Sequence, residues 1–417
     1  MSDKRQKDTR HTLAQLTDQC VKCGLCLPAC PTFQITDNEA ASPRGRVVLA
    51  EGIVGTEADN ASRLHSLAGH IDDCLQCQAC ESVCPSEVQL SEIIRLSRQF
   101  LPETPARRLT RRMTATLHSR WRRRLLAAVL YVVQKNRLAP WLKPLLPVTL
   151  QRGLQHTLPV PLGPLASAPA TGWFPHPSKG SRAKTVGILS GCSAELHDAI
   201  NLPAVVQLLH AAGFNAWIPP KQNCCGALAH HHGENIHALT QTNARAFSNP
   251  PENTQLTTVV VLNTGCSAHL EALTKKKKTQ TVYEDVMRFL SRHRHQLRFT
   301  PSTETVFAHR PCTQQHGLAA DADQSMLHLL NQVPGLTVLT AATGCCGAAG
   351  NYYLTQPQMS DALAQQWHAA ITPLQPDRVL SPNIGCSMQW HELDSGIPVE
   401  HPVAFLARQL ETRTAGT

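Results

Sequence analysis

The segment CVKCGLCLPACP, residues 20–31, places its cysteines in the spacing C-x2-C-x2-C-x3-C-P, and the segment CLQCQACESVCP, residues 74–85, repeats it. These two runs contain eight of the sixteen cysteines in the 417-residue chain. The other eight form a second, different repeat, so that no thiol is left over. A chain in which every cysteine belongs to a ligand-spaced set is predicted to be built around metal rather than around disulfides.

The first repeat has the spacing of iron–sulfur ligands. Three cysteines at this spacing bind one cubic cluster, and the fourth, before proline, binds the other cluster of a pair. The rule assigns one [4Fe–4S] cluster to Cys20, Cys23, Cys26 and Cys84, and a second to Cys74, Cys77, Cys80 and Cys30. Zinc, which also binds C-x2-C pairs, is the alternative. The third in-phase cysteine and the C-P ending favour two iron–sulfur clusters, which side by side carry electrons.

Helical patterns surround both cysteine runs. We expect helices at residues 9–19, 46–53, 61–71 and 91–100. The gap of 43 residues between Cys30 and Cys74 is longer than in a compact bacterial ferredoxin. Residues 1–100 are therefore predicted to form a helical ferredoxin-like domain with two [4Fe–4S] clusters.

Length and composition predict a cytoplasmic protein of several domains. A chain of 417 residues exceeds one ordinary core, and its hydrophobic content of 42% is that of a soluble protein. No stretch approaches the roughly 18–20 apolar residues that cross a bilayer. The charged segment from Met1 to Arg10 is not followed by the apolar region of a secretory signal. Reduced thiols and oxygen-sensitive clusters fit the cytosol.

The positive charge of the chain is concentrated in one segment. Residues 104–194 contain no Asp or Glu but fifteen Lys and Arg. Within them, arginines flank the apolar run 125–133, and Trp121, Tyr131 and Trp141 lie in or beside it. A helix on an anionic membrane surface, an interface with a partner subunit, and a solvated face packed on the chain's own domains are the three alternatives. Nucleic acid is not an expected partner, because no binding motif accompanies the charge.

A proline-rich stretch overlaps the end of this basic segment. Its prolines are Pro140, Pro144, Pro147, Pro159, Pro161, Pro164, Pro169, Pro175 and Pro177. Such a stretch is typical of an extended, semi-rigid connector. We therefore assign residues 101–182 to a basic, proline-rich connecting segment.

The remaining eight cysteines reveal an internal duplication. Cys192, Cys224, Cys225 and Cys266 correspond to Cys312, Cys345, Cys346 and Cys386, at offsets of 120 or 121 residues. A Cys-Cys-Gly and a Gly-Cys-Ser triplet occur in both copies. We expect one unit at residues 183–300 and a second at 301–417.

Each unit alternates β-rich and helical segments. Strands are predicted at residues 185–190, 214–218 and 257–262 and again at 304–309, 336–340 and 378–381, with a helix at 199–212. This alternation predicts a parallel sheet in each unit. The fold class is thus a multidomain chain, an α-helical ferredoxin-like domain followed by a duplicated α/β cysteine-rich domain.

The cysteines of each unit follow the predicted strands. Open parallel sheets bind ligands at the carboxyl ends of their strands, so three loops are expected to bring four thiols together. A metal or redox site in each unit follows, for which Cys192, Cys224, Cys225, Cys266, Cys312, Cys345, Cys346 and Cys386 are the candidates. Buried packing or a redox disulfide is the alternative for the adjacent cysteines.

These motifs carry a family resemblance. The duplicated Cys-Cys-Gly pattern resembles the cysteine-rich CCG domain of heterodisulfide reductase B-type proteins. Joined to a two-cluster ferredoxin, it resembles the iron–sulfur subunit of glycolate oxidase (glycolate dehydrogenase). The strings that carry the likeness are SPRGR at residues 42–46, PCTQQH at 311–316, CCGAAGNY at 345–352 and PNIGC at 382–386.

The resemblance implies an electron-transfer subunit with no catalytic residue of its own. An FAD-containing partner subunit would oxidise glycolate to glyoxylate, and this chain would pass the electrons towards membrane quinone. It would lie peripherally on the cytoplasmic face of the inner membrane. The corresponding subunit of an anaerobic glycerol-3-phosphate or lactate dehydrogenase is one alternative, and a free-standing disulfide or quinone reductase that uses the CCG site is another.

The chain departs from the CCG pattern at one position in each copy. Many CCG domains end in C-x2-C, but here Cys266 is followed by Ser-Ala-His269 and Cys386 by Ser-Met-Gln389. Each copy therefore offers four cysteines rather than five. One or two further iron–sulfur clusters, or an unmetallated redox site, remain open for these units.

Histidines near the second repeat are weaker candidates. His309 and His316 bracket Cys312 and are candidates for proton delivery, because quinone reduction consumes protons and imidazole titrates near neutral pH. His230, His231 and His232 follow the first Cys-Cys-Gly and are more typical of hydrogen-bonded loop residues than of ligands. No nucleotide fingerprint is present, so we expect the chain itself to bind no flavin or nicotinamide.

Overall fold

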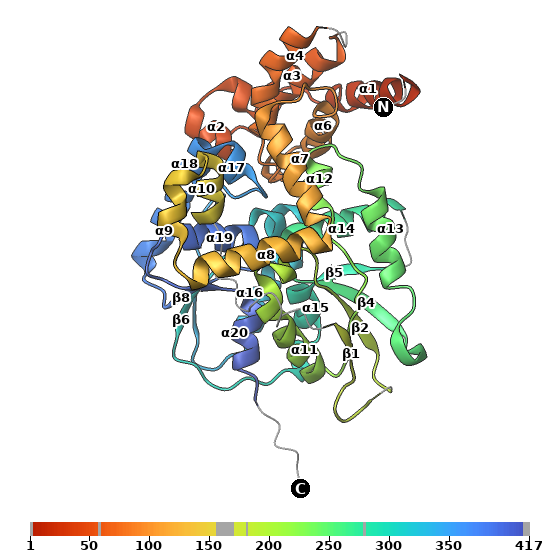
Figure 1. Cartoon of the computed structure of the whole chain (residues 1–417), viewed down its shortest axis with the longest axis vertical. Coiled ribbons are helices and arrows are strands. Elements are labelled where there is room, and N and C mark those ends of the chain that lie inside the picture. Colours follow the sequence, from red (N-terminus) through yellow and green to blue (C-terminus); the bar gives the residue numbers. More distant parts are fainter. Residues whose placement is uncertain (1–2, 57–59, 156–170, 181, 278–280, 412–417) are drawn as a thin grey trace. The chain divides into compact units, whose positions relative to one another are not determined.

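The computed structural model describes residues 3–56, 60–155, 171–180, 182–277 and 281–411 (Figure 1). The chain divides by compactness into two units. Unit 1 comprises Met1–Thr114, Leu228–Ile236 and Gly344–Gln366, and unit 2 comprises Ala115–Ala227, His237–Thr343 and Trp367–Thr417. Two short segments of the duplicated half thus belong with the N-terminal helices. The linear boundaries at residues 100, 182 and 300 stay predictions.

Unit 1 is helical, as the sequence predicts. Its N-terminal helices are α1 (Asp3–Thr17), α2 (Pro31–Thr36), η1 (Glu39–Ala41), α3 (Pro43–Val54), α4 (Ala61–Asp72), α5 (Ala79–Ser82), α6 (Leu90–Ser97) and the start of α7 (Pro105–Leu117). The Asn60 side chain caps α4 by accepting a hydrogen bond from the Arg63 amide. Leu13, Ile53, Ile71 and Ile93 are fully buried and join these helices in one core.

Two segments from the cysteine-rich repeats complete unit 1. They contain most of α12 (Ala227–His231), α17 (Tyr352–Thr355) and the first part of α18 (Pro357–Ile371). The Tyr352 hydroxyl donates a hydrogen bond to the Asp73 carbonyl at 3.0 Å, and the Asn351 amide donates to Thr110 Oγ1 at 2.6 Å. The loop before Cys74 is therefore bonded directly to the residues that follow the second Cys-Cys-Gly.

Unit 2 contains two sheets. The first is built from β1 (Gly172–Phe174), β2 (Thr185–Leu189), β3 (Asn215–Ile218), β4 (Leu256–Val261) and β5 (Tyr283–Asp285), in the order β1-β3-β2-β4-β5. The second is built from β6 (Thr305–Ala308), β7 (Thr337–Leu339), β8 (Arg378–Leu380) and β9 (Val399–Glu400), in the order β7-β6-β8-β9. Six of these strands, β2–β4 and β6–β8, confirm the predicted ones.

The pairing is parallel throughout the second sheet and mixed in the first. In the first sheet β2–β5 are parallel, but the edge strand β1 pairs antiparallel with β3. The predicted parallel pairing is confirmed for the six predicted strands, and β1, which was not among them, adds an antiparallel edge. An antiparallel edge strand on an otherwise parallel sheet is common in α/β folds.

Four helices join the two sheets through one hydrophobic core. They are α11 (Asn201–Ala211), α15 (Val286–Arg292), α16 (Ala322–Leu330) and α20 (Pro402–Arg408). Helix α11 packs against α20, and α15 packs against α16, so that the helices lie between the sheets (Figure 1). Val186, Phe289, Met326 and Phe405 are among the buried residues of this core. Other helices of unit 2 include α13 (His237–Ala246), α14 (Thr264–Lys277) and α19 (Ile384–Glu392).

Two asparagines at equivalent positions connect the copies where β4 and β8 end. Asn263 Oδ1 accepts a hydrogen bond from the Ile384 amide at 2.8 Å, and the Asn383 amide group donates to Thr264 Oγ1 at 2.9 Å. The Thr264 amide also donates to the Pro382 carbonyl at 3.2 Å. The carboxyl ends of these strands, where the last cysteine of each copy follows, are thus fixed to each other.

The basic segment and the first part of the proline-rich stretch are helical. The basic segment forms α8 (Arg120–Lys135), and the proline-rich stretch, for which an extended chain is predicted, begins with α9 (Ala139–Leu142), η2 (Lys143–Leu145) and α10 (Val148–Gln155). The prediction is wrong at residues 139–155, because prolines are accepted in the first turn of a helix or just before it. The connector residues Pro159, Pro161, Pro164 and Pro169 lie outside the described residues.

A search of the described ranges finds no helix that combines the length and the apolar character needed to span a membrane.

Candidate iron–sulfur and cysteine-rich sites

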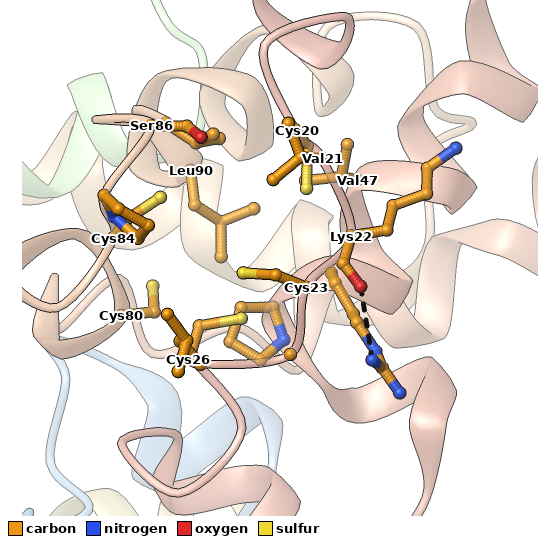
Figure 2. Close-up of a pocket in the computed structure, with 16 residues that line it drawn as sticks. Cys20, Val21, Lys22, Cys23, Cys26, Val47, Cys80, Cys84, Ser86 and Leu90 are labelled. Carbon is orange, nitrogen blue, oxygen red and sulfur yellow. Dashed lines mark hydrogen bonds between the residues drawn. The ribbon is translucent and has the colours of Figure 1, made fainter.

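The first set of predicted ligands lines one cavity in unit 1. Cys20, Cys23, Cys26 and Cys84 border it together with Cys80. Figure 2 shows their sulfur atoms directed towards a common space around Leu90, with Val47 behind it. Four thiols set in aliphatic walls form a donor set that suits iron–sulfur binding.

The second set lines a neighbouring cavity. Cys30, Cys74 and Cys77 border it, and Cys80 is again part of the wall. The structure therefore brings Cys30 to the cysteines of the second run and Cys84 to those of the first. This is the exchange that the spacing rule predicts, and the individual ligand assignments stay predictions.

Left-handed residues curl both cysteine loops in the same way. Lys22 and Gly24 have φ values of 57° and 88°, and the residues 54 positions later, Gln76 and Gln78, have values of 52° and 64°. Non-glycine residues adopt this conformation only when the surrounding structure holds them there. The repeated conformation turns successive cysteines of each run towards one space.

Several thiols line each cavity, and among the residues that the structure describes no group of three His, Cys, Asp or Glu side chains is arranged to hold a single metal ion. Burial raises the pKa of the Cys77 and Cys80 thiols, so that metal binding at these residues releases protons.

A buried arginine holds the loop that leads into the second set. Arg98 Nη1 donates a hydrogen bond to the His231 carbonyl at 2.8 Å, and Nη2 donates to the carbonyls of Asp72 and Cys74 at 3.3 Å each. The Asp72 carboxylate pairs with Arg98 at 3.3 Å and with Arg107 at 2.7 Å. The Gln76 amide also donates to the His231 carbonyl, at 2.9 Å. The loop carrying Cys74 and Cys77 is thereby bonded to the segment after the first Cys-Cys-Gly.

The four cysteines of the first repeat converge in unit 2. Cys192 follows β2, Cys224 and Cys225 follow β3, and Cys266 lies in the first turn of α14 after β4. The sulfur atoms of Cys224 and Cys192 are 3.7 Å apart, and those of Cys225 and Cys266 are 3.0 Å apart. The expectation of four thiols gathered beyond the strand ends is met in this copy.

Gly226 provides backbone donors to this thiol group. Its φ of 86° is in the left-handed region, and its amide donates to Cys224 Sγ at 3.4 Å. The Ala227 amide donates to Cys225 Sγ at 3.5 Å. The hydrogen bond with Cys224, followed by burial, raises the pKa of the Cys192 thiol, and the charge of Arg123 opposes this shift. These donors would stabilise thiolates bound to metal.

The cysteines of the second repeat are divided between the two units. Cys345 and Cys346 belong to unit 1, whereas Cys312 and Cys386 belong to unit 2. In unit 1, the Gly347 amide donates to Cys345 Sγ at 3.4 Å, as Gly226 does in the first copy. Cys345 packs in one buried cluster with Leu75, Tyr352 and Cys77. The second ferredoxin-type set and the second Cys-Cys-Gly are therefore neighbours within unit 1.

Buried polar residues occupy the positions of the missing fifth cysteines. His269, three residues after Cys266 on α14, is 7% exposed, and Gln389, three residues after Cys386 on α19, is 2% exposed. Neither copy therefore turns this position towards bulk solvent. The sixteen cysteines all lie within the described ranges, and no disulfide joins any two of them.

Of the candidate histidines, His309 is buried, and the others are half-buried. His231 Nδ1 pairs with the Gln76 side chain, and His232 Nε2 pairs with Asn351 Oδ1 at 3.2 Å. His309 Nδ1 lies 3.1 Å from Ser381 Oγ, and burial lowers the pKa of His309 to about 3. Burial also lowers the pKa of His316. Both imidazoles are neutral at pH 7, and proton delivery by either stays a prediction.

Several residues at the sites have no strong signal in the sequence. Asn223, the residue that distinguishes the first Cys-Cys-Gly from the second, accepts a hydrogen bond from Arg123 at 2.9 Å and donates to the His118 carbonyl at 2.9 Å. It thus attaches α8 to the first cysteine loop. Arg98 looks like any helical arginine in the sequence. Only the burial of its helix, α6, which follows the second cysteine run, could have drawn attention to it.

Comparison with known proteins places two kinds of domain on the chain. Residues 16–88 match the model of a 4Fe-4S dicluster domain. Residues 186–271 and 306–390 each match the model of a cysteine-rich domain. These ranges contain all sixteen cysteines.

Two relatives match this chain over nearly their whole length, and a third matches about half of it. The probable glycolate oxidase iron–sulfur subunit of Bacillus subtilis (strain 168) is 27% identical, with 93% of this chain and 92% of the relative covered. The glycolate oxidase iron–sulfur subunit of Escherichia coli (strain K12) is 25% identical, with 94% of each covered. The fumarate reductase (CoM/CoB) of Methanothermobacter marburgensis has a chain that is 23% identical, with 47% of this chain and 39% of the relative covered.

Proposed function

We propose that this chain, a homologue of glycolate oxidase iron–sulfur subunits with a 4Fe-4S dicluster domain and two cysteine-rich domains, is the electron-transfer subunit of a glycolate-oxidising complex. The observation that carries the proposal is that neighbouring cysteine sites follow one another in space within unit 1. The first cavity adjoins the second through Cys80, and the second adjoins Cys345 through Cys77. Redox sites so arranged form a path rather than a single reaction centre.

The residues of the chain supply the ligands and the surroundings. Cys20, Cys23, Cys26 and Cys84 would hold one [4Fe–4S] group, and Cys30, Cys74, Cys77 and Cys80 the other. When bound, such groups accept and release single electrons. Aliphatic side chains such as Val47 and Leu90 would exclude water from the first of them. The first cysteine-rich quartet would hold a further redox group, and Cys345 and Cys346 are candidate ligands of another.

The substrate chemistry would take place on a partner. Oxidation of glycolate to glyoxylate releases two electrons and two protons, which an FAD-containing subunit would accept and pass on one electron at a time. The sequence of this chain has no nucleotide-binding fingerprint, which supports such a division of labour. Membrane quinone is the proposed final acceptor.

Helix α8 supports a peripheral membrane contact. Its buried face contains Arg123, Ala127, Leu130 and Val133. Its opposite face exposes Trp121 (66%), Leu125 (57%), Val129 (51%) and Val132 (48%), beside the exposed Arg122 and Arg124. An apolar helix face flanked by arginines suits an anionic lipid surface on the cytoplasmic side of the membrane.

The membrane contact is tested with lipid vesicles. Arg122→Gln with Arg124→Gln should reduce sedimentation with vesicles that contain anionic phosphatidylserine at low salt. Arg123 is excluded from the variant because it is buried and bonded to Asn223. Unchanged sedimentation of the double variant would assign this face to a partner subunit instead.

Anaerobic purification with iron counting tests the main proposal. We expect at least eight iron atoms per chain, a co-purifying flavoprotein, and glycolate-dependent reduction of a quinone by the complex only. Reduction of a quinone or a disulfide by the isolated chain, with no flavoprotein, would instead support a free-standing reductase. A protein that takes up no iron under reconstitution would refute both functions.

A further inference from the structure

The string SPRGR, residues 42–46, is explained only in part by the start of α3. Ser42 Oγ accepts a hydrogen bond from the Gly45 amide at 2.9 Å, and Pro43 occupies the first turn. A Cβ atom on Gly45 would lie 1.9 Å from the Glu39 carbonyl oxygen, so that only glycine fits. These three residues fix the helix start. They do not account for the two arginines.

Arg46 is a buried cation directed at a predicted cluster ligand. Its side chain is among the largest that are fully buried, with 1% of the residue exposed. Nε donates to the His70 carbonyl at 2.9 Å, Nη2 to Thr32 Oγ1 at 3.1 Å, and Nη1 to Cys30 Sγ at 3.8 Å. Cys30 is itself buried, and its sulfur also lies 3.3 Å from Thr32 Oγ1.

A buried guanidinium requires a negative partner, because its desolvation is otherwise strongly unfavourable. None of the ion pairs recorded between described residues joins Arg46 to a carboxylate. The Asp73 carboxyl interacts electrostatically with Arg46, but these two described side chains form no ion pair. The atom that the structure places against the guanidinium and that becomes negative on metal binding is the sulfur of Cys30.

Arg44, two residues earlier, is a natural comparison. It lines the first cavity, where Nη1 donates to the Lys22 carbonyl at 3.3 Å. Its charge, however, is already paired with Glu39, through Nε at 2.7 Å and Nη2 at 3.2 Å, and one third of its side chain is exposed. The arginine at the rim of the first site is therefore paired with a carboxylate. The arginine of the second site is buried and forms no ion pair with a carboxylate of the described residues.

We propose that Arg46 is the charge-compensating residue of the second site, which is formed by Cys30, Cys74, Cys77 and Cys80. Its guanidinium balances the Cys30 thiolate. The group at this site is therefore easier to reduce than the group held by Cys20, Cys23, Cys26 and Cys84. The proposal rests on the proposed function. Hydrogen bonds to the ligand sulfurs and positive charge nearby both raise the reduction potential of an iron–sulfur group. Arg46 supplies both from a buried position beside the buried Cys30. It acts as a positioning residue, through Cys30.

The test is an anaerobic redox titration of the full chain, monitored by EPR spectroscopy, with iron counted in every variant. The Cys77→Ser variant identifies the signal of the second site. In Arg46→Gln, the ratio of reduced to oxidised second site at the wild-type midpoint should fall about tenfold, which is a shift of about 59 mV for a one-electron couple. Arg46→Lys, which keeps the charge, and Arg44→Gln, which removes a paired charge, should each change the corresponding ratio by less than threefold.

The outcomes separate this inference from the function on which it rests. An unchanged second midpoint in iron-replete Arg46→Gln, or equal shifts of both signals, would overturn the role of Arg46 alone. If Arg46→Gln does not retain its iron, Arg46→Met takes its place, because it removes the charge while keeping much of the side-chain volume. A lowered second midpoint then supports the inference, and an unchanged one overturns it. A wild-type protein without iron–sulfur signals would overturn the proposed function as well.

Discussion

Replacement of Arg98 by methionine should open the loop that carries Cys74. Arg98 directly follows α6, at its C-cap position, with only 4% of its side chain exposed, and it pairs with the Asp72 carboxylate at 3.3 Å. Its two terminal nitrogens donate hydrogen bonds to the backbone carbonyls of Asp72, Cys74 and His231. Methionine keeps much of the volume but leaves Asp72 with Arg107 alone and several carbonyls without their donor.

The expected magnitude follows from these contacts. Removal of one partner from a buried ion pair destabilises by about 3–5 kcal/mol. Because each 1.4 kcal/mol is a factor of ten, local opening should become roughly 10²- to 10⁴-fold more frequent. The loss is confined to unit 1, since every contact of Arg98 named above lies within it.

Hydrogen exchange detected by mass spectrometry measures this opening directly. The informative peptide covers residues 69–78, in which the Asp73 amide donates to Gly69 and the Cys74 amide to Ile71. Peptides from β4 in unit 2 should exchange as in the wild type. Arg98→Lys should fall between the two, since lysine keeps the charge but cannot reach several carbonyls at once.

Arg95→Met is the matched control. Arg95 lies one turn earlier on α6 and pairs only locally with Glu92, at 2.7 Å. Such partly exposed pairs contribute at most about 1 kcal/mol. If exchange in residues 69–78 stays within threefold of the wild type in Arg98→Met, or rises equally in Arg95→Met, the buried guanidinium is not what holds the loop.

Three further predictions concern other parts of the chain. Cys30→Ser should remove the EPR signal that Cys77→Ser removes, and Cys84→Ser the other one; the opposite pattern would show that the ligands are not exchanged between the runs. Burial raises the pKa of Asp285 from 3.8 to about 7, so the folded chain keeps a proton that the unfolded chain releases. The free energy of unfolding should therefore fall as pH rises from about 4 to about 7, by up to about 4 kcal/mol, and Asp285→Asn, which can still cap α15, should flatten that fall in urea titrations at pH 5.5 and 7.5. Gly45→Ala should lower the stability of unit 1 by about 3 kcal/mol or more, because its Cβ would meet the Glu39 carbonyl; an unchanged melting temperature would contradict this.

The sequence predicted the strands of the duplicated half well, because β-branched runs such as residues 257–262 are bounded by turn residues and are buried on both faces. It failed at β1, where Gly-Trp-Phe between prolines has no strand pattern. It failed also at residues 139–155, because prolines mark extended chain and first helical turns alike. Both failures concern short elements whose conformation depends on neighbours far along the chain.

The candidate site, too, could be predicted from the sequence only in part. Cysteine spacing predicted which thiols line each cavity, since ligand spacing is a local property of the chain. The packing of residues 228–236 and 344–366 with the N-terminal helices could not be predicted, because it depends on hydrogen bonds such as Tyr352 to Asp73 that span more than a hundred residues. Arg46 was visible as part of a recognisable string, but only its burial reveals a partner in Cys30.

Asn263 and Asn383 each form a hydrogen bond with the residue that follows the other. The two copies thus meet as two subunits of a dimer would, but within one chain. Contacts in which one position meets its own counterpart are those of a two-fold dimer. When the two halves of such a dimer are fused in one chain, each interface residue is encoded twice and the halves can specialise separately. Here Asn223 of the first copy binds Arg123 of α8, whereas Cys345 of the second copy packs beside Cys77. A symmetric dimer of identical subunits could not give its two cysteine sites such different neighbours.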